Sequence, residues 1–146
     1  MSIRKEARDL NIELTTKEFR RLLDLVYIGN WILNSTRGDD RFEDYDHVES
    51  KLFGLCRSMG MSNLVERWQG EDIPSRAFSD GGIHEAIMDY EDTVFFEILA
   101  EELARRDMGY AEVSSSNYDE LVSRMDDYIA EFEAHGTDNI LVDTDG

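Results

Sequence analysis

Apolar residues recur at helical spacing along residues 16–37 and predict the first helix of the chain. Thr15 followed by Glu18 matches a capping box, in which each side chain accepts a hydrogen bond from a backbone N–H at the helix start. One apolar row consists of Phe19, Leu22, Leu23, Val26, Tyr27 and Leu33, and a second consists of Leu25, Ile28 and Ile32. A helix that is apolar on more than one side is usually enclosed by its neighbours. We therefore expect this helix at the centre of the core, ending before Gly38.

The same periodicity predicts further helices over residues 45–59, 62–68, 83–108 and 114–134. Gly60 stands directly after the first of these segments, where glycine often ends a helix. The last segment has the clearest apolar stripe, formed by Tyr118, Leu121, Val122, Met125, Ile129 and Phe132. We therefore predict a mainly α fold, a single-domain helical bundle of four to six helices around the first helix.

Two short apolar runs near the ends of the chain are candidates for a small two-stranded pairing of the termini. Residues 11–15 alternate apolar and polar side chains, which is typical of a strand, and residues 140–142 form an apolar run in a polar tail. Residues 1–10 and 143–146 are predicted to be frayed, as polar chain ends usually are. No break in composition divides the chain, so we predict one helical domain over residues 1–146.

Residues 70–82 contain the sole proline, Pro74, and are predicted to form a loop. Loops of this length in compact domains are often functional or disordered. Trp68 precedes the loop, and Ile73 and Phe78 lie within it, so all three are candidate apolar anchors for a binding partner. The alternative is that these side chains pin the loop to the core, and the sequence leaves both interpretations open.

The segment around Gly29 is the most unusual part of the first helix. A glycine in a helix interior costs about 1 kcal/mol relative to alanine. Asn30 and Asn34 share one face of an otherwise apolar segment, and buried amides must find hydrogen-bond partners. This pattern predicts close helix packing at Gly29 and an internal polar network. The alternative is a small pocket or partner-contact patch that includes the two asparagines.

The charge of the chain limits the classes of partner. The sequence has 33 acidic and 15 basic residues and a formal net charge of −18 at pH 7. Because nucleic-acid binding relies on Lys and Arg that neutralise phosphates, direct binding to nucleic acid or to an anionic membrane is not expected. No run approaches the roughly 20 apolar residues that span a bilayer, and residues 1–10 lack the apolar stretch of a signal peptide. We therefore predict a cytoplasmic protein without membrane association.

Motifs for catalysis or metal binding are incomplete in this sequence. His84 begins a partial HExxH zinc motif, but Met88 occupies the second ligand position. Asp44 and His47 resemble one Glu-x-x-His pair of a di-iron bundle, which needs two such pairs. Cys56 is the sole cysteine, which excludes an intramolecular disulfide. Since no nucleophile motif or phosphate-binding loop is present, we predict no catalytic residue, metal ligand or cofactor.

Two runs of the sequence resemble segments of known bacterial proteins. Residues 22–31, LLDLVYIGNW, are similar to the opening helix of a group of short bacterial proteins of unknown function. Residues 90–108, YEDTVFFEILAEELARRDM, are similar to the later acidic helix of the same proteins, and the two runs cover about a quarter of the chain. The resemblance implies a bacterial or phage-related origin. It implies no activity, and no functional residue is transferred from it.

These observations favour a non-catalytic, acidic, intracellular interaction protein whose surface meets a basic partner protein. The alternative is a metal-binding protein or enzyme that uses carboxylates with His84 or His47. The candidate partner-binding residues are Trp68, Ile73, Phe78, Asn30 and Asn34. The sequence leaves the oligomeric state and the identity of the partner open.

Overall fold

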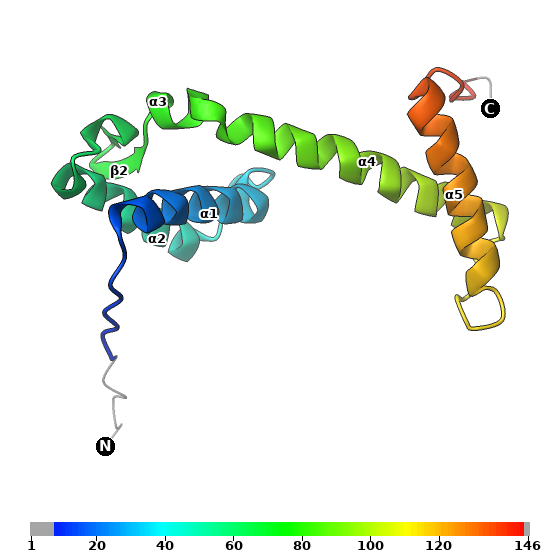
Figure 1. Ribbon diagram of the computed structural model, residues 1–146, viewed down its shortest axis with the longest axis horizontal. Helices are drawn as coiled ribbons and strands as arrows, with labels where there is room; N and C mark the ends of the chain where they lie inside the picture. The colour runs from blue at the N-terminus through cyan, green and yellow to red at the C-terminus, as the bar shows by residue number, and fades with distance from the viewer. Residues whose placement is uncertain (1–7, 145–146) are drawn as a thin grey trace. The chain divides into compact units, whose positions relative to one another are not determined.

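The computed structural model describes residues 8–144 and confirms a mainly helical fold with one small sheet (Figure 1). The chain separates into two compact units, of which the first ends at His84 and the second begins at Glu85. The first unit contains α1 (Thr16–Asn34), α2 (Glu43–Gly54), the short turns η1 (Leu55–Met59) and η2 (Ser62–Leu64), the strands β1 (Val65–Trp68) and β2 (Glu71–Pro74), and α3 (Arg76–Phe78) with the turn η3 (Ser79–Ile83). The prediction of one domain over residues 1–146 stays a prediction.

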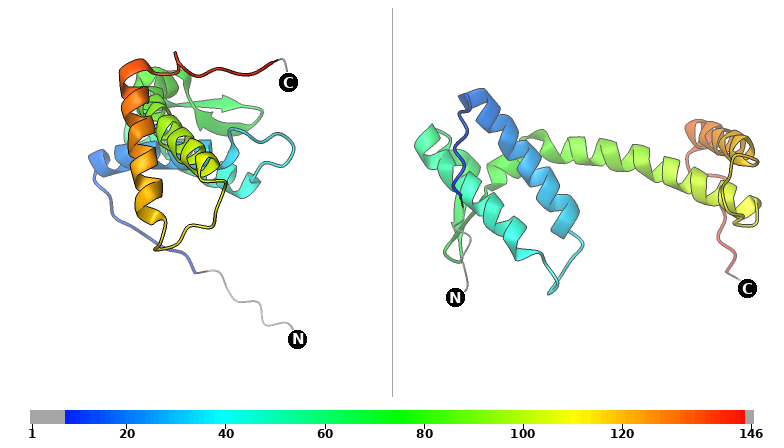
Figure 2. Two further views of the ribbon diagram at one scale, coloured as in Figure 1. Left: turned by 90° about the vertical axis from the view of Figure 1, so that its right-hand side faces the viewer. Right: turned by 90° about the horizontal axis from the view of Figure 1, so that it is seen from below.

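Helix α1 begins where the sequence predicts. The side-chain oxygen of Thr15 accepts from the backbone N of Glu18 at 3.1 Å, and the Glu18 carboxylate accepts from the backbone N of Thr15 at 3.0 Å. These two bonds complete the capping box. Helices α1 and α2 lie side by side (Figure 2). The core of the unit consists of Phe19, Leu23, Phe53, Cys56, Val65 and Phe78.

Only one of the two apolar sides of α1 is covered within the first unit. Leu23 is fully buried, whereas Leu25 is 68% exposed and Ile32 is 66% exposed. The expectation of an enclosed central helix is therefore wrong for this unit, because its elements pack on a single face of α1. Periodicity identifies the apolar rows of a helix, but it does not give the number of neighbours that cover them.

The sheet is an antiparallel hairpin inside the first unit. Strands β1 and β2 pair with Val65 opposite Pro74. Gln69 and Gly70 form the connecting turn with φ angles of 50° and 78°, as the twist of a two-residue hairpin requires. This corrects the predicted helix and loop over residues 62–82, because the turn lets two adjacent short segments pair with each other locally.

The predicted pairing of the termini is wrong. Residues 11–14 and 140–142 carry no strand, and Ile12 and Leu141 are 69% and 90% exposed. A pair of strands is marginal in water unless another layer covers one of its faces. The hairpin packs against α2 and closes through a two-residue turn, whereas the termini are separated by most of the chain, which costs more loop-closure entropy.

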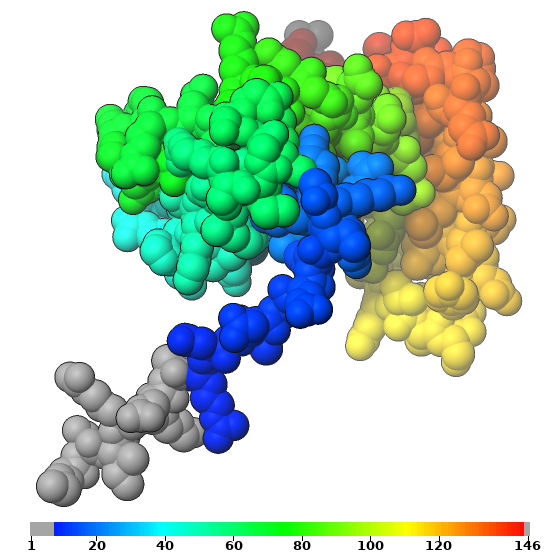
Figure 3. All heavy atoms as spheres, turned by 60° about the vertical axis from the view of Figure 1, so that its left-hand side comes forward, coloured from blue at the N-terminus to red at the C-terminus, as the bar shows by residue number. Residues whose placement is uncertain are grey.

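The ends of the chain are partly described. Residues 8–10 and 143–144 have no regular secondary structure. The remainder of the predicted frayed ends, residues 1–7 and 145–146, lies outside the described residues. Residues 8–14 extend away from the surface of the first unit (Figure 3).

The second unit is a pair of helices, α4 (His84–Asp107), whose first residue still belongs to the first unit, and α5 (Tyr118–His135), and α5 crosses the carboxyl-terminal half of α4 (Figure 1). Ala100 and Ala104 are fully buried on the face of α4 that also carries Phe96. The ring of Phe96 lies 5.4 Å from the ring of Phe132 on α5. Small and aromatic side chains therefore form the contact between the two helices. No helix among residues 8–144 is long and apolar enough to cross a membrane.

Candidate binding site

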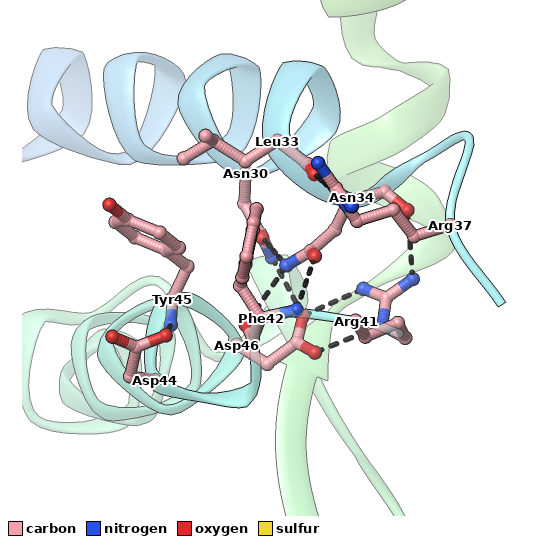
Figure 4. A network of polar contacts seen from close by, with 9 residues as sticks. All are labelled: Asn30, Leu33, Asn34, Arg37, Arg41, Phe42, Asp44, Tyr45 and Asp46. Atoms are coloured by element: carbon pink, nitrogen blue, oxygen red, sulfur yellow. Dashed lines mark hydrogen bonds and ion pairs between the residues drawn. The ribbon is translucent and has the colours of Figure 1, made fainter. Parts of the chain in front are cut away.

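Asn30 and Asn34 join the end of α1 to the start of α2 (Figure 4). The two asparagines are one helical turn apart, so they share a face. The Nδ2 atom of Asn34 donates to Oδ1 of Asn30 at 2.7 Å and to the carbonyl of Phe42 at 3.1 Å. Its Oδ1 atom accepts from the backbone N of Phe42 at 2.8 Å, and Asn30 donates to Asp46 at 2.9 Å. The two amides therefore form the internal polar network that their spacing predicts.

Arg41 and Asp46 form an ion pair at the edge of this network. The guanidinium of Arg41 donates to both carboxylate oxygens of Asp46, at 2.7 and 3.0 Å, and to the carbonyl of Asn34 at 3.3 Å. The pKa of Asp46 lies below its ordinary value, mainly because Arg41 donates hydrogen bonds to the carboxylate. Partial burial has the opposite effect and raises this pKa. A bidentate pair fixes the orientation of both side chains, so Asp46 offsets the positive charge of Arg41.

A hollow of about 500 Å³, which we call the hairpin hollow, lies between α2 and the β1–β2 hairpin. Its lining residues are Tyr27, Arg41, Asp46, Glu49, Ser50, Trp68, Glu71, Asp72, Ile73, Pro74 and Ser79. A second hollow of about 320 Å³ is lined by Tyr27, Asn30, Trp31, Ser35, Arg41 and Glu49. Tyr27, Arg41 and Glu49 belong to both linings and form a shared wall. Aromatic and apolar surface beside a few polar groups is typical of a binding site.

Glu49 is a half-buried carboxylate in the shared wall. Burial is the main cause that raises the pKa of Glu49 from 4.5 to about 7. A hydrogen bond from Asn30 opposes the rise, and the negative charge of Asp46 adds to it. The site can therefore gain or lose one negative charge near neutral pH, which is a property of many functional sites.

Tyr27 is held in the shared wall by an aromatic cluster. Its hydroxyl lies 2.6 Å from Nε2 of His84, and the His84 ring meets the ring of Trp31 edge-on at 4.8 Å. Burial and then the charge of Glu49 raise the pKa of Tyr27 above its ordinary value. The tyrosine therefore stays neutral at physiological pH and offers an aromatic face to both hollows.

The structure brings three of the five predicted binding residues to these hollows. Trp68 is 59% exposed at the hairpin hollow, and Ile73 is half-buried in its lining. Asn30 lines the second hollow, although it is 8% exposed. Asn34 lines neither, because its amide is fully engaged in the network at 1% exposure.

Phe78 is not a surface anchor, which corrects its proposed role. It is 1% exposed, and its ring lies 4.9 Å from the ring of Phe53 and 5.2 Å from that of Tyr27. The hydroxyl of Ser75 accepts from the backbone N of Phe78 at 3.2 Å and so starts the short helix α3. This turn directs Phe78 into the core, so it pins the segment after the hairpin, as the alternative interpretation holds.

The two histidines of the alternative function have different surroundings. His84 pairs with Tyr27, whereas His47 is exposed on α2. Within residues 8–144, no group of three or more His, Cys, Asp or Glu side chains is arranged to hold a metal ion. Cys56 is buried in the core, and burial raises the pKa of its thiol.

Sequence reasoning missed the shared wall. Glu49 lies between Asp46 and Phe53 at helical spacing, so it belongs to the face of α2 that carries a core phenylalanine. That position could have marked it as a carboxylate with a perturbed pKa. No helical or strand pattern marks Arg41, which lies in the loop before α2 and is held at the site by Asp46 and by the carbonyl of Asn34.

Comparison of the chain with protein-family models, with curated proteins and with solved structures gives no match. The resemblance of residues 22–31 and 90–108 to short bacterial proteins therefore stays a prediction. The assignment of a function rests on the geometry of the site.

Proposed function

We propose that this protein is a non-catalytic interaction protein that binds a basic segment of another protein in the hairpin hollow. The observation that carries the proposal is the position of Trp68, a largely exposed aromatic side chain at a hollow lined by four acidic residues and one basic residue. Exposed tryptophans in such settings are frequent anchors of protein–protein interfaces.

The charges around the hollow favour a cationic occupant. Arg41 is paired with Asp46, and Asp72 accepts hydrogen bonds from Arg57 at 2.6 Å and Arg67 at 3.3 Å. Of the lining carboxylates, Glu49 and Glu71 have no ion-pair partner among residues 8–144. These two groups are available to a guanidinium or ammonium group.

An arginine or lysine side chain matches both the apolar and the acidic residues that line the hollow. Its aliphatic stem can pack on Trp68 and Ile73, and its charged head can meet Glu49 or Glu71. The net charge of −18 attracts a basic partner from a distance and accelerates association at low salt. The same charge opposes direct contact with nucleic acid. We further propose that this binding takes place in the cytoplasm of a bacterial cell.

The test is a titration of a fluorescein-labelled peptide of alternating Arg and Leu residues, followed by fluorescence anisotropy. We expect Trp68→Ala to weaken binding of this peptide by about tenfold, while the melting temperature changes little because Trp68 lies outside the core. Tyr118→Ala is the matched control, since Tyr118 is 56% exposed on the second unit. We also expect association to slow as ionic strength rises.

Two results would contradict the proposal. Unchanged affinity of both Trp68→Ala and Tyr118→Ala would mean that the peptide responds to net charge rather than to the hairpin hollow, because neither substitution changes the charge. Equal loss of folding and of binding in Trp68→Ala would assign the tryptophan a structural role.

A further inference from the structure

The outward face of α1 carries an apolar stripe that the first unit leaves uncovered. Leu22, Leu25, Gly29 and Ile32 follow one another at spacings of three, four and three residues, which places them on one side of the helix, and Ile28 lies at the edge of this stripe. Leu25 and Ile32 are 68% and 66% exposed, and the other three are half-buried. Phe19 and Leu23, the two core residues that α1 contributes, lie on the opposite side of the helix.

Gly29 has no packing partner within the first unit. A Cβ atom added at Gly29 would meet no other atom of the first unit within 4 Å, so the close packing predicted at this position is absent among residues 8–84. Its φ is not in the left-handed region either. Glycine in a helix interior is less stable than alanine, so this residue weakens α1 without a compensating contact in the first unit. A glycine on an apolar helix face lets another backbone or a bulky side chain approach closely.

We propose that this stripe is a self-association surface, occupied by α1 of a second copy of this chain in antiparallel orientation. The stripe is self-complementary in that orientation. Leu25 and Gly29 stand two residues on either side of Tyr27, and Leu22 and Ile32 stand five residues on either side. A two-fold axis at the level of Tyr27 therefore places Leu25 of one copy over Gly29 of the other, and Leu22 over Ile32, with both pairs made twice.

Charge supports a second copy at this surface. Helix α1 carries three basic residues, Lys17, Arg20 and Arg21, and two acidic residues, Glu18 and Asp24. The antiparallel arrangement about Tyr27 brings Arg21 of one copy to the level of Leu33 in the last turn of the other helix, which carries partial negative charge. Most of the surface of a chain with a net charge of −18 repels a second copy. This stripe lacks that excess of acidic groups, so two copies can meet there.

The test is sedimentation velocity of the full chain at concentrations from about 1 µM to about 1 mM, because an interface of one helix per copy is small and its dissociation constant is expected to be micromolar. We expect a concentration-dependent shift from monomer to dimer. Leu25→Glu should remain monomeric throughout. Ile98→Glu is the matched control, since Ile98 is 55% exposed on α4, and it should self-associate like the unchanged chain.

Gly29→Ala separates this proposal from a purely structural account. The added methyl group has open space within the chain, so the variant should melt at a higher temperature in dilute solution, and its helix content by circular dichroism should not fall. The same methyl group should weaken self-association by about tenfold, because it fills the space that Leu25 of the second copy occupies. A monomer at every concentration, unchanged or stronger association of Gly29→Ala, or loss of association in Ile98→Glu would each overturn the proposal.

Discussion

Replacing Glu49 with glutamine is expected to stabilise the first unit above neutral pH and to leave its stability unchanged in acid. Glutamine keeps the size and the hydrogen-bonding capacity of a protonated glutamic acid but cannot ionise. In the folded chain, burial raises the pKa of Glu49 to about 7, whereas its ordinary value is 4.5. The folded state therefore binds more protons than the unfolded state between these two values. Its free energy of unfolding falls as pH rises through that window.

The size of the effect follows from the same two values. One pKa unit corresponds to about 1.4 kcal/mol, so a rise from 4.5 to about 7 corresponds to about 3 kcal/mol at most. Glu49→Gln should gain about this amount over the unchanged protein at pH 8, about 2 kcal/mol at pH 6, and almost none at pH 4. The acidic residues whose pKa values are lowered affect both proteins equally, so the difference between the two isolates Glu49.

Urea unfolding followed by tryptophan fluorescence measures this difference. Both tryptophans, Trp31 and Trp68, belong to the first unit, so the signal reports on that unit even if the second unit unfolds separately. Glu66→Gln is the control, because Glu66 is exposed on β1 in the same unit, and it should change stability by less than about 0.5 kcal/mol. A loss of stability at pH 8 in Glu49→Gln, or a difference that does not depend on pH, would refute the reasoning.

Two further predictions concern the polar network and the proposed binding. Asn34→Ala should lower the free energy of unfolding by about 2–3 kcal/mol, because it removes the buried hydrogen-bond partner of Asn30 and Phe42. Asn63→Ala, at an exposed position, should leave the free energy of unfolding unchanged. Equal urea midpoints for the two variants would contradict the network. Binding of the Arg–Leu peptide should tighten between pH 6 and pH 8, because a cation prefers the ionised form of Glu49. The affinity of Glu49→Gln for the peptide should not depend on pH in this range. A pH dependence that survives in the variant would assign the effect to another group.

The sequence by itself determined the local elements of this protein. The capping box at Thr15 and the apolar rows after it are enough to predict α1, because helix starts and periodicity depend on neighbouring residues. The network of Asn30 and Asn34 was predictable for the same reason, since two amides one turn apart on an apolar helix must find partners. The excess of acidic residues also limits the class of partner, because net charge depends on composition alone.

Tertiary structure alone decided which surfaces are covered and which side chains meet. Phe78 and Trp68 are both aromatic and ten residues apart, yet one is in the core and the other at a hollow, because the hairpin turn and the Ser75 cap reverse the chain between them. Glu49 acquires its raised pKa from burial, and Arg41 reaches Asp46 across the start of α2. Desolvation and side-chain pairing depend on which elements pack together, and local sequence patterns do not encode that packing.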